Sequence, residues 1–122
     1  MIRILIVDDQ AATRKGLRML LSLENDLDVV GEAEDGAAGV AYALATSPDV
    51  VLMDIAMPGL DGISATADIR SLLPSSSVVI LTLHDDPQTR ERAYNAGAAA
   101  VLGKHEGDEA LLQAIRRARN ER

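Results

Sequence analysis

Carboxylate side chains follow directly after two short apolar runs of this chain. Asp8 and Asp9 follow residues 4–7, and Asp54 follows residues 50–53. An apolar run of this length between turn formers is typical of a strand covered on both faces, as in a parallel sheet. Ligands of open α/β sheets bind beyond the carboxyl ends of the strands. We therefore expect Asp54 to face a functional crevice rather than the core.

In the strand order that small α/β domains adopt, the first and third runs are neighbours, so Asp8, Asp9 and Asp54 would converge. Carboxylates placed close together repel one another, and without a counterion at least one pKa would rise. Mg²⁺ suits such a site because it takes few protein carboxylates and completes its octahedron with water and phosphate oxygens. The sequence therefore predicts a Mg²⁺ site.

Two further polar residues stand at the ends of later apolar runs. Thr82 ends the run that begins at residue 78, and Lys104 follows the run at residues 100–102. A hydroxyl and an ammonium group in the same crevice can bind two oxygens of a phosphoryl group. Asp54 is then the candidate nucleophile, which would form an aspartyl phosphate. Each residue alone is better explained as a turn, strand or surface residue, but their occurrence at four strand ends favours one common site.

Apolar runs alternate with segments of helical periodicity along the whole chain. The expected strands are residues 4–7, 29–30, 50–53, 78–81 and 100–102. The expected helices begin after Gln10, at Asp35, at Asp61, at Asp86 and near Asp108. Parallel neighbours need crossover helices, and right-handed crossovers are strongly preferred. The pattern predicts an α/β fold: a doubly wound five-stranded parallel sheet of flavodoxin-like order 2-1-3-4-5.

The periodicity also predicts which side of each helix is buried. The expected inward residues are Leu17, Leu20 and Leu21 in the first helix, Ala37, Val40, Ala41 and Leu44 in the second, Ala65, Ile69, Leu72 and Leu73 in the third, and Leu111, Leu112, Ile115 and Ala118 in the fifth. Arg14, Lys15 and Arg18 are expected to point outward. The fourth helix has only Ala93 and Ala96 to bury, so we expect it to be weakly held.

Composition limits the functions open to the chain. With 122 residues we expect one domain, residues 1–122. The net charge of −7 argues against direct nucleic acid binding and favours cation binding. The amino-terminal apolar run is too short for a signal peptide or a membrane span. The absence of Cys fits a cytoplasmic protein without a disulfide scaffold.

Taken together, these motifs resemble the receiver domains of two-component response regulators, over essentially the whole chain. The matching segments are residues 5–9, 52–54, 57–59, 61–62, 81–82 and 96–98, which lead to Lys104. The resemblance implies that Asp54 is the phosphoacceptor and that a sensor histidine kinase supplies the phosphoryl group. It implies that Asp9 binds Mg²⁺ directly, Asp8 largely through water, and the Ala56 backbone carbonyl completes the protein ligands. Thr82 would be the switch hydroxyl and Lys104 its ion-pair partner.

Residues 57–62, 81–86 and 96–98 are closer still to the NarL/FixJ subfamily, whose receivers precede a LuxR-type helix-turn-helix domain. The resemblance implies a DNA-binding effector domain downstream of Arg122 in a longer protein, with a transcriptional output. It implies a phosphoacceptor that promotes its own phosphorylation and dephosphorylation rather than an enzyme. A homodimer is a further expected partner, through either the first and fifth helices or the fourth and fifth.

Two of the departures from the receiver pattern bear on how a signal would pass. Val101 stands three residues before Lys104, where many receivers carry Tyr or Phe, so any signal must pass through the loop after Thr82 and the fourth helix. Leu83 is larger than the residue usual after the switch threonine, and is expected to narrow access to Asp54. These departures leave open a receiver-fold module that is regulated by protein contact without phosphorylation.

Two other functions are compatible with parts of the pattern. A Mg²⁺-dependent phosphohydrolase of the dehalogenase type would use the same aspartyl nucleophile, but it would need a second Asp two residues later, where this chain has Ala56. A flavodoxin-like FMN binder would need a glycine-rich phosphate loop after the first strand, and residues 9–13 are acidic and contain no glycine.

Overall fold

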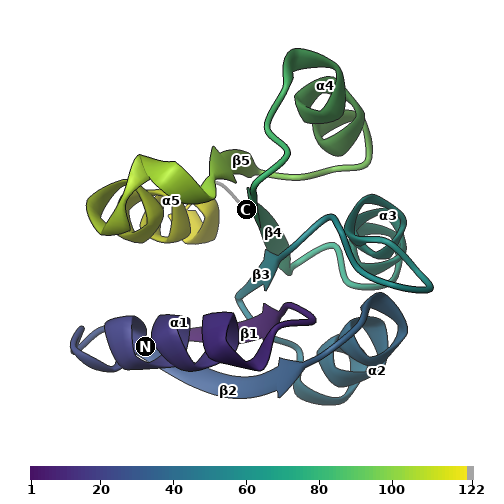
Figure 1. Cartoon of the computed structure of the whole chain (residues 1–122). Coiled ribbons are helices and arrows are strands. Elements are labelled where there is room, and N and C mark those ends of the chain that lie inside the picture. Colours follow the sequence, from purple (N-terminus) through teal and green to yellow (C-terminus); the bar gives the residue numbers. More distant parts are fainter. Residues whose placement is uncertain (121–122) are drawn as a thin grey trace.

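The computed structural model describes residues 1–120; Glu121 and Arg122, the end of the predicted domain, lie outside the described residues. One parallel sheet runs through the molecule in the order β2-β1-β3-β4-β5, which confirms the predicted topology (Figure 1). Its strands are β1 (Ile2–Val7), β2 (Leu27–Ala33), β3 (Val50–Met53), β4 (Ser77–Thr82) and β5 (Ala100–Gly103). The second strand, at the edge of the sheet, is longer than expected because it continues beyond the Val29–Val30 pair into polar and small residues, including Asp28, Gly31 and Glu32.

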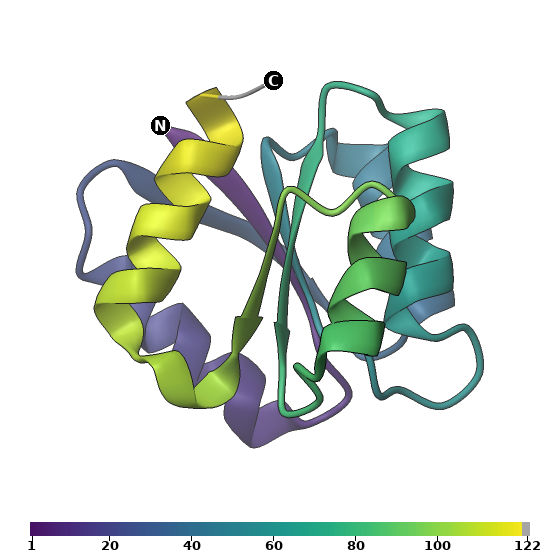
Figure 2. The same ribbon diagram turned by 90° about the horizontal axis from the view of Figure 1, so that it is seen from above.

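Helices cover both faces of the sheet. On one face lie α1 (Ala11–Ser22) and α5 (Asp108–Asn120), and on the other lie α2 (Gly36–Thr46), α3 (Gly62–Leu72) and α4 (Pro87–Asn95) (Figures 1 and 2). A short 3₁₀ turn, η1 (Lys104–Glu106), joins β5 to α5. Among residues 1–120, no helix combines the length and the apolar character needed to cross a membrane.

Alternate residues of the central strands pack into two apolar layers. In β3, Val51 and Met53 face α2, α3 and α4, whereas Val50 and Leu52 face α1 and α5. The strands can be apolar on both sides because both of their faces are covered. The layers are made almost wholly of Val, Leu, Ile and Ala, as a chain without Phe or Trp requires.

Three helices begin at the aspartates that the sequence indicated. The side chains of Asp35, Asp61 and Asp86 each accept a hydrogen bond from the backbone N–H three residues later. This bond satisfies one of the N–H groups that the first turn of a helix leaves without a partner. These three caps fix where α2, α3 and α4 leave the carboxyl edge of the sheet.

The predicted inner face of α2 was wrong at three of its four positions; the fourth, Val40, is partly buried and packs against the core. Ala37, Ala41 and Leu44 are exposed, and the buried positions are Gly36, Gly39 and Ala43. A Cβ atom added to Gly39 would lie 2.9 Å from a methyl carbon of Val7, so glycine lets the helix approach the sheet closely. Periodicity methods weight large apolar side chains and therefore selected the wrong side of the helix.

Helix α3 differs in the same way at its carboxyl end. Leu72, predicted to point inward, is 54% exposed. Ile63 and Thr66 are buried instead, beside the correctly predicted Ala65 and Ile69. The hydroxyl of Thr66 can be buried because it donates to the Gly62 carbonyl oxygen at 2.7 Å.

The faces predicted for the last two helices are confirmed. In α4 only Ala93 is buried, and Ala96, just after the helix, is partly buried. In α5 the predicted residues Leu111, Leu112, Ile115 and Ala118 are all buried.

Candidate functional site

The carboxyl ends of β1 and β3 bring two acidic residues side by side. Val7 pairs with Met53, and the next residues along the two strands are Asp8 and Asp54. The backbone N–H of Asp54 donates to the Val7 carbonyl oxygen at 3.0 Å, and that of Asp8 donates to Ala33 at 3.1 Å. The backbone of both acidic residues is therefore held by neighbouring strands.

Asp8, Asp9 and Asp54 form an acidic cluster. One carboxylate oxygen from each lies within 4.8 Å of the others. Asp8 and Asp54 are only 2% and 7% exposed, whereas Asp9 is exposed to solvent. The expectation that these three side chains converge is met, and their oxygen-only donor set is the kind that hard divalent cations prefer.

Lys104 reaches this cluster from the end of β5. Its Nζ lies 3.1 Å from Oδ2 of Asp8 and 4.0 Å from Oδ2 of Asp54. Burial raises the pKa of Asp54, while the Lys104 ammonium group lowers it, and the neighbouring Asp8 and Asp9 carboxylates raise it further. The net direction of the Asp54 pKa is upward, with burial as its largest cause.

Thr82 ends β4 at the same edge of the sheet, where it pairs with Gly103 beside Lys104. It is fully buried, and its Oγ1 accepts a hydrogen bond from the backbone N–H of His84 at 3.1 Å. Its hydroxyl is thus fixed at the start of the loop that leads to α4. Leu83, expected to narrow access to Asp54, is itself 72% exposed.

The backbone carbonyl group of Ile55 anchors the loop that follows Asp54. Ile55 accepts backbone hydrogen bonds from Met57 at 3.1 Å and from Gly62 at 3.0 Å. A Cβ atom on Gly62 would lie 1.9 Å from the Asp54 carbonyl oxygen, so only glycine fits there. Ala56, whose backbone carbonyl was predicted as a metal ligand, is an exposed residue of this loop.

Arg14 belongs to the site although the sequence placed it on the outer face of α1. Its Nη1 donates to the Asp8 backbone carbonyl oxygen at 2.6 Å, and its Nε donates to Glu32 at 3.3 Å. The side chain is only 16% exposed. The signal available in the sequence was an arginine in the first turn of α1, five residues after Asp9. Helical periodicity placed it on the outer face.

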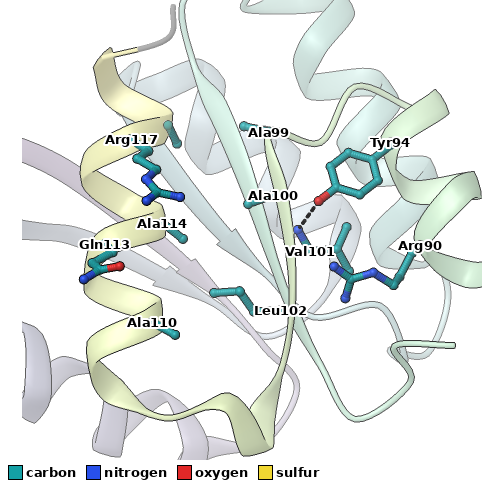
Figure 3. Close-up of a pocket in the computed structure, with 11 residues that line it drawn as sticks. Arg90, Tyr94, Ala99, Ala100, Val101, Leu102, Ala110, Gln113, Ala114 and Arg117 are labelled. Atoms are coloured by element: carbon teal, nitrogen blue, oxygen red, sulfur yellow. Dashed lines mark hydrogen bonds between the residues drawn. The ribbon is translucent and has the colours of Figure 1, made fainter. Parts of the chain in front are cut away.

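The open edge of β5 carries a second feature, away from the acidic cluster. The hydroxyl of Tyr94 on α4 accepts a hydrogen bond from the Val101 backbone N–H at 3.3 Å (Figure 3). Next to this bond, a cavity of about 340 Å³ lies between α4, β5 and α5. Arg90 of α4 and Arg117 of α5 lie on its two sides (Figure 3).

The fold is a doubly wound α/β sheet with helices on both faces (Figure 2). At the carboxyl ends of its strands lies an acidic, oxygen-donor centre. The response regulator receiver domain family matches residues 4–116. The chain belongs to this family and is a receiver domain of the two-component response regulator type.

Individual relatives agree with this assignment. The chain is 43% identical over 117 residues to the transcriptional regulatory protein YxjL of Bacillus subtilis, covering 96% of this chain and 54% of that protein. It is 41% identical over 118 residues to the transcriptional regulatory protein LiaR of the same species, covering 97% and 56%. It therefore spans about half the length of these curated relatives.

Solved structures of the family superpose closely on this fold. The signal receiver domain of the response regulator NarL from Mycobacterium tuberculosis matches with a TM-score of 0.94 and 36% identity, covering 99% of this chain and 98% of that one. A two-component response regulator of the LuxR family from Aurantimonas matches with a TM-score of 0.93 and 34% identity, covering 98% and 86%.

Proposed function

We propose that this receiver accepts a phosphoryl group on Asp54 from a phosphohistidine of a sensor histidine kinase. The observation that carries the proposal is the convergence of Asp8, Asp9, Asp54 and Lys104 at one end of the sheet. Asp54 is 7% exposed, so only a small part of its surface is open to a donor. The domain is a phosphoacceptor that assists its own phosphorylation and dephosphorylation, and it is not a conventional enzyme.

Mg²⁺ fits the residues present at this site. Asp8, Asp9 and Asp54 offer carboxylate oxygens close enough to share one ion, and we propose the Ala56 backbone carbonyl as the remaining protein ligand. Three carboxylates face one ammonium group, that of Lys104, so a divalent cation would offset the repulsion among them. When bound, the ion would neutralise the charge that collects on the phosphoryl oxygens.

The proposed transfer uses the chain's own side chains for attack and orientation. A carboxylate oxygen of Asp54 attacks phosphorus, an O–P bond forms, and the P–N bond to the donor imidazole breaks, with the electron pair returning to the ring nitrogen. Lys104 lies 4.0 Å from Asp54 and can bind one phosphoryl oxygen. We propose that the Thr82 hydroxyl leaves the His84 N–H to bind another.

We propose that helix α4 and the loop before it report the phosphorylation. Thr82 begins this loop, so a shift of its hydroxyl toward Asp54 would pull directly on residues 83–86. Helix α4 buries only Ala93, so little packing resists its displacement. Phosphorylation should therefore change amide hydrogen exchange most in residues 83–97, and an equal change elsewhere would contradict this route.

The remaining partners follow from the length of the relatives. Because the chain spans about half of proteins named as transcriptional regulators, we propose that residues 1–122 form the receiver unit of a longer protein. A LuxR-type helix-turn-helix domain after Arg122 would bind DNA and give a transcriptional output. Self-association of the receiver and a cytoplasmic location stay predictions.

The test is phosphorylation by a small-molecule donor such as acetyl phosphate in the presence of Mg²⁺. Intact-mass measurement should show one added phosphoryl group, and Asp54→Asn should show none. Glu34→Gln, a change at an exposed acidic residue of the loop after β2, provides a control that keeps the phosphoacceptor. An adduct that persists in Asp54→Asn would mean that Asp54 is not the acceptor.

The same experiment separates the two alternatives. A receiver regulated by protein contact alone would remain unmodified with every donor, including a histidine kinase. A phosphohydrolase would release inorganic phosphate over many turnovers from simple phosphate monoesters, which a phosphoacceptor does not do. Ala56 supports the phosphoacceptor, because its side chain cannot act as the second acid of a dehalogenase-type site.

A further inference from the structure

We propose that Arg14 is a positioning residue for the acidic cluster, and that it acts by holding the peptide group between Asp8 and Asp9. The inference rests on the proposed function of that cluster in binding Mg²⁺ and a phosphoryl group. Its basis is the 2.6 Å hydrogen bond from Arg14 Nη1 to the Asp8 backbone carbonyl oxygen. Arg14 is buried enough, at 16% side-chain exposure, for this bond to be well protected from water.

Other groups fix the remaining polar atoms of Asp8. Its N–H donates to Ala33, its Oδ1 accepts from the Gln10 backbone N–H at 2.9 Å, and its Oδ2 lies 3.1 Å from Lys104 Nζ. The Asp8 carbonyl oxygen completes this set through Arg14. The N–H, the carbonyl oxygen and both carboxylate oxygens of Asp8 therefore all have partners, and Arg14 of α1 is the partner of the carbonyl oxygen.

The carbonyl group that Arg14 holds belongs to the peptide plane that joins Asp8 to Asp9. Because a peptide group is planar, fixing the direction of the Asp8 carbonyl also fixes the direction in which the chain enters Asp9. Asp9 is exposed, with no neighbouring strand to orient it. Arg14 thus sets the orientation of the more exposed of the two adjacent ligands.

Glu32 at the end of β2 keeps the Arg14 guanidinium in place. Its Oε1 accepts from Arg14 Nε at 3.3 Å, and its Oε2 accepts from Arg18 Nε at 2.6 Å. Arginine is suited to this double role because its planar fork donates in two directions at once. Arg18 shares the partner Glu32 but is 48% exposed and has no bond to Asp8, so it provides a matched control.

Positioning and charge make opposite predictions for Mg²⁺ affinity. If Arg14 acted only as a positive charge near the cluster, its removal would leave the site more negative and Mg²⁺ would bind more tightly. If Arg14 orients the ligands, its removal weakens binding. Groups that orient metal ligands typically contribute tenfold or more to affinity, so the positioning effect should dominate.

The experiment measures Mg²⁺ binding to the unphosphorylated protein by calorimetry and by the amide NMR shifts of Asp8, Asp9 and Asp54. Arg14→Gln should raise the dissociation constant about tenfold. Arg14→Lys should fall between this variant and the wild type, because its ammonium group can still donate to the Asp8 carbonyl oxygen but lacks the fork that also binds Glu32. Arg18→Gln removes the same charge and should change the constant less than about twofold.

Phosphorylation by acetyl phosphate at increasing Mg²⁺ gives an independent measurement. The Mg²⁺ concentration for half-maximal rate should rise in Arg14→Gln, while the rate at saturating Mg²⁺ should stay close to that of the wild type. Glu32→Gln should also raise the Mg²⁺ concentration for half-maximal rate, by a smaller factor, and leave the rate at saturating Mg²⁺ nearly unchanged. If Arg14→Gln does not fold, Arg14→Lys and Glu32→Gln carry the test.

The outcomes distinguish this inference from the proposed function. Tighter or unchanged Mg²⁺ binding in Arg14→Gln, with normal labelling of wild-type Asp54, overturns the role of Arg14 alone. Equal weakening in Arg14→Gln and Arg18→Gln also overturns it, because Arg18 does not contact Asp8. A wild-type protein that binds no Mg²⁺ overturns both, whereas weakened binding in a chain labelled at a residue other than Asp54 overturns only the proposed acceptor.

Discussion

The acidic edge of the sheet and helix α4 are held in place by very different means. Asp8 and Asp54 extend the hydrogen bonding of the central strands and are almost fully buried. Helix α4 buries only Ala93 and reaches β5 through the Tyr94 hydroxyl. A site that must hold ligands precisely benefits from rigid support, whereas an element that must move needs low local stability. Under the proposed function, the acidic edge would carry out the chemistry and α4 would carry the response.

The support of the acidic edge can be broken at Gly62. In Gly62→Ala the new Cβ would lie 1.9 Å from the Asp54 carbonyl oxygen, and the obstacle is backbone that cannot rotate away. We expect the free energy of unfolding in urea to fall by about 3 kcal/mol, the upper part of the range for overpacking. This is the largest effect that we predict for a single added methyl group.

Gly16→Ala is the matched control for that variant. Gly16 lies in α1 with no atom within 4 Å of the position that a Cβ would take. The same methyl group should therefore stabilise the protein by about 0.5–1 kcal/mol through helix propensity. If both variants lose stability equally, the close approach at Gly62 does not support the acidic edge.

The electrostatic cost of the acidic edge can be relieved at Asp54. Burial raises the pKa of this carboxyl group above the unfolded value of 3.8, so the folded state binds its proton more tightly than the unfolded state does. Stability is therefore lost as pH rises from below 3.8 through the raised folded pKa, and the loss is complete above it. Asp54→Asn removes this dependence and should be more stable than the wild type at pH 7.

The stability gain should disappear in acid and shrink in Mg²⁺. Below pH 3.8 the carboxyl group is protonated in both states and resembles the amide. At neutral pH, Mg²⁺ should stabilise the wild type more than the variant, because it binds the folded acidic cluster. Urea titrations between pH 3 and pH 8, with and without Mg²⁺, measure both effects. A gain independent of pH would show that charge at Asp54 is not its cause.

The attachment of α4 can be loosened at Tyr94. Tyr94→Phe removes the hydroxyl that accepts from the Val101 N–H but keeps the ring. One hydrogen bond is worth about 1 kcal/mol, so amide exchange in α4 should accelerate roughly fivefold with little change in global stability. Exchange near Asp8 and Asp54 should not change.

Tyr42→Phe on α2 is the control for this last variant. Tyr42 and Tyr94 are both 45% exposed, and within residues 1–120 the Tyr42 hydroxyl makes no hydrogen bond. The control should leave exchange unchanged in every helix. Acceleration that extends from α4 to the acidic edge in Tyr94→Phe would mean that the two regions are not independently held.

Most of the architecture was predictable because local signals and the global fold agree. The apolar runs located the strands, and the aspartates before α2, α3 and α4 located their first turns. The strand order then required Asp8 and Asp54 to meet. Burial within α2 and α3 was less predictable, because Gly39 and Thr66 are buried for reasons of close approach and hydrogen bonding that periodicity does not measure.

By itself, the sequence determined the family, the sheet order and the set of acidic residues at the strand ends, since these depend on residue type and spacing. Only the tertiary structure decided that Arg14 turns inward to the Asp8 carbonyl and that Tyr94 reaches Val101. Both contacts join a helical side chain to the backbone of a strand. A backbone N–H or carbonyl group is the same for every residue, so no sequence pattern marks which one a side chain will reach.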